Sequence, residues 1–469
     1  MQPVSEPLRH FTTPGKLPLE PTSLKHRLVR AASWSLLGFG LAQVIRLGSN
    51  LLLTRMLAPD LFGVMVIGYM VMVGVGMFSD IGLGPSIVRS TRGDEPRFLN
   101  VSWVVQILRG GIITVFGLCV ALALHFAASG QATGGTASVY GDPRLPGIVA
   151  GLSMLGLIAG LESTKVWLER RRMALKRLTQ IELVSGIVTT AVTLLWAYWS
   201  RSIWAFVFGG LIGSVARTAL THWALPGPAN RIEWESKAFD EIFAFGKWAF
   251  LSSMLTFLIS SGDRILLGGV LDPKTMGFYA IAFLIINALQ TAVGKIEAYA
   301  VLPALAEVVR ERPADLKRTI YRVRFPVDVV CLLSSGALFM LGDLVVKLLY
   351  DSRYAPAGWM MSILALTLVT TRLDMFDQCV LSLGRPKLLS GLNTVRLVTI
   401  YSLVPLGYMS YGLQGVIWAV ACSSLANAIA VLYLQRRLEL LDVKRELIAL
   451  PLFVAGLLIG WLVGLPFRH

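Results

Sequence analysis

The sequence has few charged residues, few cysteines and few histidines, and each shortage narrows the class of protein. Only 15% of the 469 residues are charged, whereas an ordinary soluble protein carries about a quarter. The four cysteines lie singly in apolar stretches without metal or redox spacing, so packing is their expected role. The five histidines form no Ser-His-Asp or metal-ligand pattern, and no Gly-x-x-x-x-Gly-Lys-Ser/Thr loop is present. The sequence therefore predicts no catalytic residue, no metal site, no cofactor and no direct use of ATP.

Hydrophobic residues make up 55% of the chain, and its mean hydropathy is +0.66. Continuous apolar runs of about 20 residues recur along the chain, each long enough to cross a bilayer as a helix. They do not alternate as the strands of a membrane barrel would. The sequence predicts an all-α integral membrane protein with helices at 31–54, 61–88, 98–127, 145–164, 178–199, 202–222, 241–261, 275–303, 325–349, 356–384, 388–410, 413–435 and 447–466.

The formal net charge of +15 is distributed unevenly along the chain. Among the connections between predicted helices, those on one side hold 28 lysines and arginines and those on the other hold 7. The positive-inside rule makes the rich side, with the N-terminus, cytoplasmic. Basic loops beside lipid headgroups explain the charge without nucleic acid. The N-terminal 23 residues lack the plan of a cleavable signal, so we expect the first helix to be an uncleaved insertion signal in a bacterial inner membrane.

Two hydrophobic stretches, 34–67 and 248–281, align without a gap and are identical at 11 of 34 positions. The identical pairs include Trp34 with Trp248, Pro59 with Pro273, and Gly63 with Gly277. Many secondary transporters are built from such duplicated halves, with the substrate site between them. Each proline is expected to open a helix after a tight turn.

Because the repeats begin at the first and seventh predicted helices, each half holds six spans and the halves are parallel. We expect a cytoplasmic tail, two six-helix lobes around a central cavity, a cytoplasmic linker between the lobes and an extra C-terminal segment that crosses once or is re-entrant. The corresponding ranges are 1–30, 31–226, 227–240, 241–437 and 438–469.

Five short segments in and around the two repeats carry a family resemblance. They are RMLAPDLFG at 55–63, DIGLGPSIVR at 80–89, FGKW at 245–248, DRILLG at 263–268 and GFYA at 277–280. With the topology, they resemble Wzx-type polysaccharide flippases of the multidrug, oligosaccharidyl-lipid and polysaccharide exporter superfamily. The thirteenth span departs from the usual twelve or fourteen.

The resemblance implies a secondary-type carrier, not an enzyme. Its partner would be an undecaprenyl-pyrophosphate-linked oligosaccharide, moved from the inner to the outer leaflet by alternating access for exopolysaccharide, capsule or O-antigen of lipopolysaccharide. Membrane lipids, a proton or sodium ion in exchange, and a polysaccharide polymerase with its co-polymerase are further partners that the resemblance implies.

Moving a pyrophosphate through hydrocarbon requires a wet path with cations, because a bare dianion would cost tens of kcal/mol. Eight basic residues fall inside predicted spans: Arg46, Arg109, Arg217, Lys247, Lys295, Lys347, Arg372 and Arg396. Arg217, Lys247 and Lys347 lie near span ends, where their side chains would snorkel. The other five are candidate substrate-binding cations.

Each of these five has an alternative structural role. Arg46, Arg109 and Arg396 have no acidic neighbour in sequence and would contact either an anion or a neighbouring helix. Lys295 could instead pair with Glu297. Arg46, in mid-helix, is the preferred site residue.

Acidic residues inside spans are candidates for ion coupling. Asp374 and Asp377 share one helix face, and two carboxylates there could bind a proton or sodium ion. Pairing of Arg372 and Asp377 with neighbouring helices is the alternative, and Glu297 is a third candidate. Asp263 and Arg264 are expected to form an end-of-helix pair.

Three other functions remain open at this point. A lipid II or multidrug exporter would share the superfamily fold, although a cationic drug would favour acidic residues. A membrane glycosyltransferase or polymerase would need a large outer loop or an acidic motif, and the longest predicted outer loop is only 128–144. A membrane scaffold would not need buried cations.

Overall fold

The computed structural model describes residues 24–80, 82–130 and 138–467, and every regular element within these ranges is helical. The main helices are α1 (Leu24–Met56), α2 (Pro59–Phe78), α3 (Leu83–Arg89), α4 (Pro96–Gly130), α5 (Leu145–Gly160), α6 (Lys165–Arg171), α7 (Leu175–Ser200), α8 (Trp204–Trp223), α9 (Ser236–Val270), α10 (Pro273–Ile296), α11 (Leu302–Glu311), α12 (Leu316–Leu349), α13 (Ala357–Leu364), α14 (Thr367–Ser382), α15 (Pro386–Arg437) and α16 (Val443–Gly464). A π-helical turn, η2 (Glu297–Val301), and the 3₁₀ turns η1 (Val139–Gly141), η3 (Pro313–Asp315), η4 (Ser352–Tyr354) and η5 (Leu465–Phe467) complete the chain. Most of the predicted tail, 1–23, lies outside the described residues.

The all-α membrane prediction is confirmed. Within the described ranges, ten helices are long and apolar enough to cross a membrane, or twelve if each of two bent pairs is one span. The bent pairs are α5 with α6, at 64°, and α13 with α14, at 42°. Helix α15 joins two helical stretches at Tyr411 and Gly412, whose backbone is not helical. The predicted helix 61–88 is broken before α3, where Gly82 has a φ of 58°.

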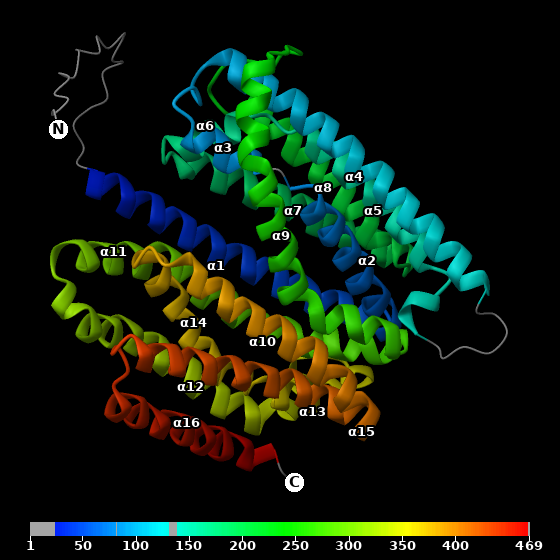
Figure 1. Cartoon of the computed structure of the whole chain (residues 1–469). Coiled ribbons are helices and arrows are strands. Elements are labelled where there is room, and N and C mark those ends of the chain that lie inside the picture. Colours follow the sequence, from blue (N-terminus) through cyan, green and yellow to red (C-terminus); the bar gives the residue numbers. More distant parts are fainter. Residues whose placement is uncertain (1–23, 81, 131–137, 468–469) are drawn as a thin grey trace, which may run out of the picture.

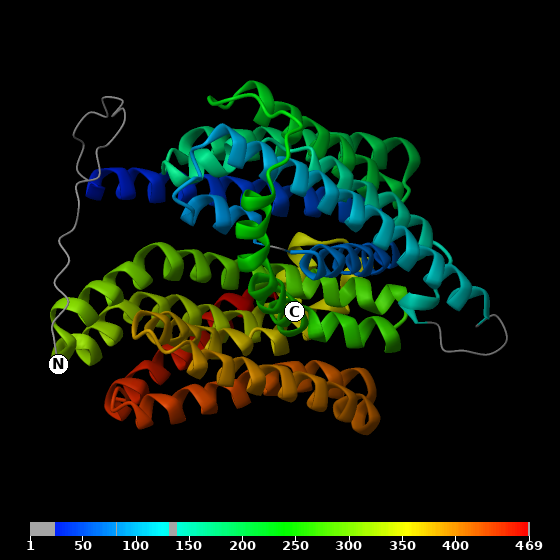
Figure 2. The same cartoon turned by 45° about the horizontal axis from the view of Figure 1, so that its top comes forward.

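The helices form two groups, which we call the first lobe (α1–α8) and the second lobe (α10–α16). In the first lobe α4 packs on α5, α8 on α7, and α7 on α1. In the second, α12 packs on α13 and α16, and α14 on α15. Figures 1 and 2 show the two groups, with α9 running from one to the other. The extra C-terminal helix α16 lies along α12 and so belongs to the second lobe.

The lobes meet where the two repeats form their turns, and we call this the hairpin end of the bundle. There α2 packs against α10. A Cβ atom on Gly63 would lie 1.9 Å from the Pro273 carbonyl oxygen, and one on Gly277 would lie 1.9 Å from the Pro59 carbonyl oxygen. The contact is reciprocal, because the glycine of each copy meets the proline carbonyl of the other copy. The two backbones therefore touch at positions that correspond in the repeat. Only glycine allows this approach.

Other contacts close the hairpin end. From the second lobe, Arg353 donates to the carbonyl oxygens of Thr54 (3.2 Å) and Arg55 (3.1 Å) at the end of α1. The Tyr354 hydroxyl donates to the carbonyl of Leu57 over 3.0 Å. These bonds tie the second lobe to the end of the first hairpin.

At the opposite end, which we call the tail end because α1 begins there, the linker binds the first lobe. Arg92 donates to both carboxylate oxygens of Glu235 at 3.0 Å, and this hydrogen bonding holds the pKa of Glu235 below its ordinary value. Ser90 donates to Glu241 over 2.6 Å. Helix α9 begins at Ser236, so the end of the predicted linker 227–240 is helical. The first turns of α9 are therefore held by the first lobe.

Candidate functional site: two cavities and their charges

A cavity of about 410 Å³ lies within the first lobe, between α1, α2, α7 and α8. We call it the first cavity. Its charged residues are Arg46 and Glu182, and its remaining polar residues are neutral. Its lining is Ala42, Ile45, Arg46, Ser49, Asn50, Leu53, Tyr69, Glu182, Leu183, Gly186, Thr189, Thr190, Thr193 and Phe206.

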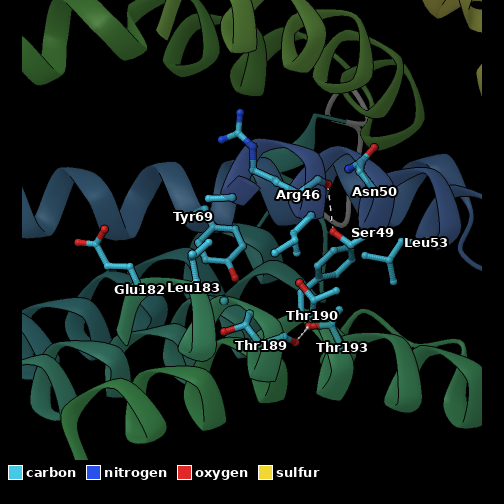
Figure 3. A pocket seen from close by; sticks show the side chains of 14 residues that line it. Arg46, Ser49, Asn50, Leu53, Tyr69, Glu182, Leu183, Thr189, Thr190 and Thr193 are labelled. Atoms are coloured by element: carbon cyan, nitrogen blue, oxygen red, sulfur yellow. Dashed lines mark hydrogen bonds between the residues drawn. The ribbon is translucent and has the colours of Figure 1, made fainter. Parts of the chain in front are cut away.

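Arg46 lies at the edge of the first cavity, on the middle part of α1. Its guanidinium makes no hydrogen bond or ion pair with any described residue; only its carbonyl is engaged, by the Ser49 hydroxyl at 3.0 Å. Figure 3 shows the guanidinium and Asn50 on the side of α1 away from Thr189 and Thr193. The guanidinium N–H groups of Arg46 are therefore free to bind a ligand beside α1.

A second cavity, of about 370 Å³, lies in the second lobe and has a different charge pattern. Three of its lining residues are charged: Glu297, Asp374 and Arg396. The other lining residues are Ile259, Ser260, Gln290, Val293, Gly294, Thr367, Thr370, Thr371, Ile400, Ser423, Ser424 and Asn427.

The charges of the second cavity form one cluster. Arg396 on α15 makes ion pairs with Asp374 and Asp377 on α14, both at 2.9 Å. The carboxylate of Glu297 lines the same cavity and is 5% exposed. The cluster therefore holds three carboxyl groups and one guanidinium. Arg396 and the two aspartates, which the sequence separates, are thus brought together.

Several acceptor atoms in this cluster have no partner among the described residues. These are Oε1 of Glu297, Oδ1 of Asp377 and Oδ1 of Asn427. Glu297 opens the π-helical turn η2, and π turns inside helices are frequent at functional sites. Unpaired oxygens inside a membrane protein are costly unless a proton, an ion or water satisfies them.

Arg372 does not reach either cavity. It pairs with Asp328 of α12 at 3.3 Å and with Glu446 of α16 at 3.0 Å. Arg324 pairs with the same two carboxylates, at 3.2 and 2.6 Å. Arg324, Asp328 and Arg372 are buried and Glu446 is half-buried, and together they join α12, α14 and α16. The guanidinium of Arg372 is thus engaged within the second lobe.

Arg109 also has structural partners. Its guanidinium donates to the carbonyl oxygens of Ser79 (2.7 Å) and Gly76 (3.0 Å), the exposed end of α2, and lies 4.0 Å from Asp80. It therefore caps α2 at the break before α3. Arg217, which was expected to snorkel, instead pairs with Glu162 at 2.9 Å.

Lys295 does not pair with Glu297, although the two are close in sequence. The lysine comes from α10 of the second lobe, yet it lines a third cavity of about 440 Å³ whose other residues come from the first lobe. Among these are Arg170 and Glu182. Within the described chain Lys295 forms no ion pair. It faces the space between the lobes, while Glu297 turns into the second cavity.

The sequence did not foresee the setting of Asp263 and Arg264. They lie inside α9, which continues to Val270, so the two residues pair as expected but not at the end of a helix. The buried Tyr279 hydroxyl of α10 donates to Asp263. Arg264 lies 3.5 Å from Asp263 and stacks over the ring of Phe283, 4.5 Å from its centroid.

The two cavities occupy equivalent places in the repeat. With the offset of 214 residues, Ile45 corresponds to Ile259 and Arg46 to Ser260, and all four residues line the cavities. The two repeats therefore place one cavity each at corresponding positions of the helical bundle.

Comparison with known proteins gives the family. A family model described as "Polysaccharide biosynthesis protein" matches residues 52–358, and the chain belongs to this family. The chain is 20% identical to a putative O-antigen transporter of Shigella flexneri over 88% of this chain and 98% of that protein. It is 20% identical to the teichuronic acid biosynthesis protein TuaB of Bacillus subtilis over 74% of this chain and 70% of that protein.

Solved structures agree on the fold. The lipid II flippase MurJ in an inward closed conformation matches with a TM-score of 0.66 and 12% identity, over 93% of each chain. An inward-facing multidrug transporter of the MATE family, within the MOP superfamily, also has a TM-score of 0.66, with 13% identity over 85% of this chain and 94% of that chain. At 12–13% identity, these structures show that the chain shares their fold.

Proposed function

We propose that the protein is a flippase for undecaprenyl-pyrophosphate-linked oligosaccharides, acting by alternating access in a bacterial inner membrane. The observation that carries the proposal is that two cations, Arg46 on α1 and Lys295 on α10, line cavities of this fold. Neither cation has an ion-pair partner among the described residues. An isolated charge in a membrane span costs at least about 2.5–3.5 kcal/mol. An anionic substrate between the lobes would offset that cost.

The basic connections assign the tail end to the cytoplasm. The hairpin end, where Gly63 and Gly277 make backbone contacts, then faces outward and is closed. A pyrophosphate would enter from the cytoplasm between Arg46 and Lys295, and the lobes would rock about their contact to release it outside. The guanidinium of Arg46 suits a pyrophosphate because its donors match two oxygens.

The carboxyl groups in the second cavity, with Asp377 beside it, supply a coupling site. Glu297, Asp374 and Asp377 would take up a proton or a sodium ion, since they outnumber their single partner Arg396. Binding of a cation there would favour one arrangement of the lobes and thereby drive turnover. Arg109 and Arg372, whose donors are used within the lobes, have structural roles in this proposal.

The test is a deletion strain complemented with the wild-type chain. Loss of the protein should cause undecaprenyl-linked repeat units to accumulate on the cytoplasmic face of the inner membrane. Accumulation of unpolymerised units on the outer face would instead indicate a polymerase and overturn the proposal.

The acidic excess of the second cavity favours one other candidate, export of cationic drugs by the same fold. A drug exporter would raise the tolerance of a sensitive host to ethidium without any effect on surface polysaccharide. Polysaccharide loss without a change in ethidium tolerance would exclude it.

A further inference from the structure

Three neutral polar side chains of the first cavity have no hydrogen-bond partner. They are Asn50 on α1, Tyr69 on α2 and Thr190 on α7. None donates or accepts a side-chain hydrogen bond within the described structure, and Oδ1 of Asn50 is shielded from solvent. Tyr69 and Thr190 thus bring two unused hydroxyls from two helices to this space, whereas Asn50 lies on the side of α1 away from Thr189 and Thr193 (Figure 3).

The other hydroxyls of this cavity are already engaged through their hydrogens. Thr189 donates to the Ser185 carbonyl at 2.9 Å, and Thr193 donates to the Thr189 carbonyl at 2.8 Å. These bonds satisfy the threonines within α7 and leave their oxygens only as acceptors. Tyr69 and Thr190 make no such hydrogen bond to a carbonyl of their own helix within the described structure, so their hydroxyl hydrogens remain free.

Polar groups inside a membrane protein are normally paired, because leaving one unpaired costs free energy. In the second cavity Gln290 donates to Thr367 and Thr371, both at 3.2 Å, while Oδ1 of Asn427 has no partner among the described residues. In the first cavity the hydroxyls of Tyr69 and Thr190 have no partner within the described structure. A ligand that enters the first cavity would complete the hydrogen bonding of these two hydroxyls.

The chemistry of the lining selects a neutral ligand rich in hydroxyls. The cavity offers the phenol of Tyr69, the hydroxyl of Thr190 and many acceptor oxygens, whereas a phosphate needs mainly donors. The carboxylate of Glu182 lines the same space and can accept hydrogen bonds from sugar hydroxyls. The Arg46 guanidinium points to the other side of α1 (Figure 3). The rings of Tyr69 and Phe206 supply apolar faces for the carbon–hydrogen side of a pyranose.

We infer that the first cavity is a sugar subsite, which holds the first sugars of the lipid-linked substrate while Arg46 binds the pyrophosphate at the cavity edge. The volume of about 410 Å³ lies in the usual range for small-ligand pockets. The inference rests on the proposed function and adds to it where each part of the substrate binds.

The test uses two probes and the purified full chain in nanodiscs. One probe is undecaprenyl pyrophosphate without sugar, and the other is the same lipid carrying one N-acetylglucosamine. In the double variant Tyr69→Phe, Thr190→Val, the loss of two hydrogen bonds should weaken binding of the glycosylated probe about tenfold or more. Binding of the sugar-free probe should not change. Both substitutions nearly conserve side-chain volume, so folding should be preserved.

The control is Thr394→Val, which removes an exposed hydroxyl of α15 that donates to its own helix and should leave both affinities unchanged. Equal weakening of both probes by the double variant, or no weakening of the glycosylated one, would overturn the sugar subsite. So would equal affinity of the wild-type protein for the two probes. Binding of neither probe by the wild-type protein would overturn the proposed function itself.

Discussion

The first and second cavities occupy equivalent places in the two repeats, but their charges are arranged differently. In the first cavity Arg46 has no ionic partner within the described structure, and the neutral groups beside it are unused. In the second, Arg396 is held by two aspartates, and Gln290 satisfies the neighbouring threonines. Duplication preserved the apolar and turn residues, while the polar residues diverged. The difference suggests that one lobe handles the substrate and the other the coupling ion.

The comparison predicts first that Arg396 matters for stability far more than Arg46. Arg396→Met should leave Asp374 and Asp377 unpaired beside Glu297, and removing one partner of a buried ion pair costs about 3–5 kcal/mol. Unfolding of the purified protein in mixed micelles measures the loss. Adding Asp374→Asn and Asp377→Asn to the variant should restore much of the stability, because no unpaired charge then remains. A single variant as stable as the wild-type protein would contradict the assignment.

Arg46 should show the opposite pattern. Arg46→Ala removes no ion pair of the protein, so its free energy of unfolding should change by no more than about 0.5 kcal/mol. Polymer export should fall about 10- to 100-fold, because hydrogen bonds to charged groups contribute about 1.5–3 kcal/mol. Arg46→Lys should retain part of the export, since it keeps the charge and loses the fork. Full export by the alanine variant at normal protein level would remove Arg46 from the site.

The sequence predicted the helices well because a span of about 20 apolar residues is a local signal. It could not predict the partners of the charges. Arg396 meets Asp374 and Asp377 only when α14 and α15 pack together, and Glu446 reaches Arg324 across 122 residues. The sequence could not choose between the two roles open to Arg109 for the same reason, because the acceptors of Arg109 are carbonyls exposed by the break after α2. That break depends on the left-handed backbone of Gly82, which hydropathy does not reveal.

The shared part of the two repeats can be tested at their reciprocal contact. Gly63→Ala and Gly277→Ala each place a methyl group against a backbone carbonyl of the other lobe. Each should therefore destabilise the closed hairpin end by a similar amount, about 1–3 kcal/mol. The rate at which a cysteine introduced at Leu57, buried beside the contact, reacts with a thiol reagent measures the opening.

Gly48→Ala is the matched control for these glycine variants. Gly48 also corresponds to a glycine in the other copy of the repeat, yet a Cβ atom at Gly48 would meet nothing within 4 Å. The substitution should be neutral or slightly stabilising, because alanine is the better helix former. If Gly63→Ala and Gly277→Ala differed strongly from each other, or matched Gly48→Ala, the reciprocal contact would not hold the lobes together.

The smallest effect is expected from two similar acidic turns at the hairpin end, one in each lobe. Asp142 accepts the backbone N–H of Arg144 at 2.8 Å and its guanidinium at 2.7–2.9 Å. Asp351 does the same with Arg353, at 2.9 Å for the backbone and 3.0 Å for Nε. Burial acts to raise the pKa of Asp142, but the hydrogen bonds from Arg144 outweigh it and lower the pKa. The backbone hydrogen bond from Arg353 is the main cause that lowers the pKa of Asp351.

These shifts predict how stability depends on pH. A carboxylate whose pKa is lower in the folded protein stabilises the fold above the unfolded value, about 3.9, and this contribution is lost as the pH falls through the folded value. The Tm of the wild-type protein should therefore fall below about pH 4, and Asp142→Asn should reduce that dependence. The difference at neutral pH should be about 1 kcal/mol, because the Arg144 side chain that pairs with the buried Asp142 is itself partly exposed.

Arg353 also bonds the carbonyls of Thr54 and Arg55 in the other lobe. Asp351→Asn should thus speed opening of the hairpin end, measured by the same thiol reaction, whereas Asp142→Asn should not, because Arg144 bonds only within its own lobe, at Asp60 and Asp142. Equal opening rates in the two variants would contradict this prediction. They would show that the two turns contribute equally to closure of the hairpin end, as the two reciprocal glycines do.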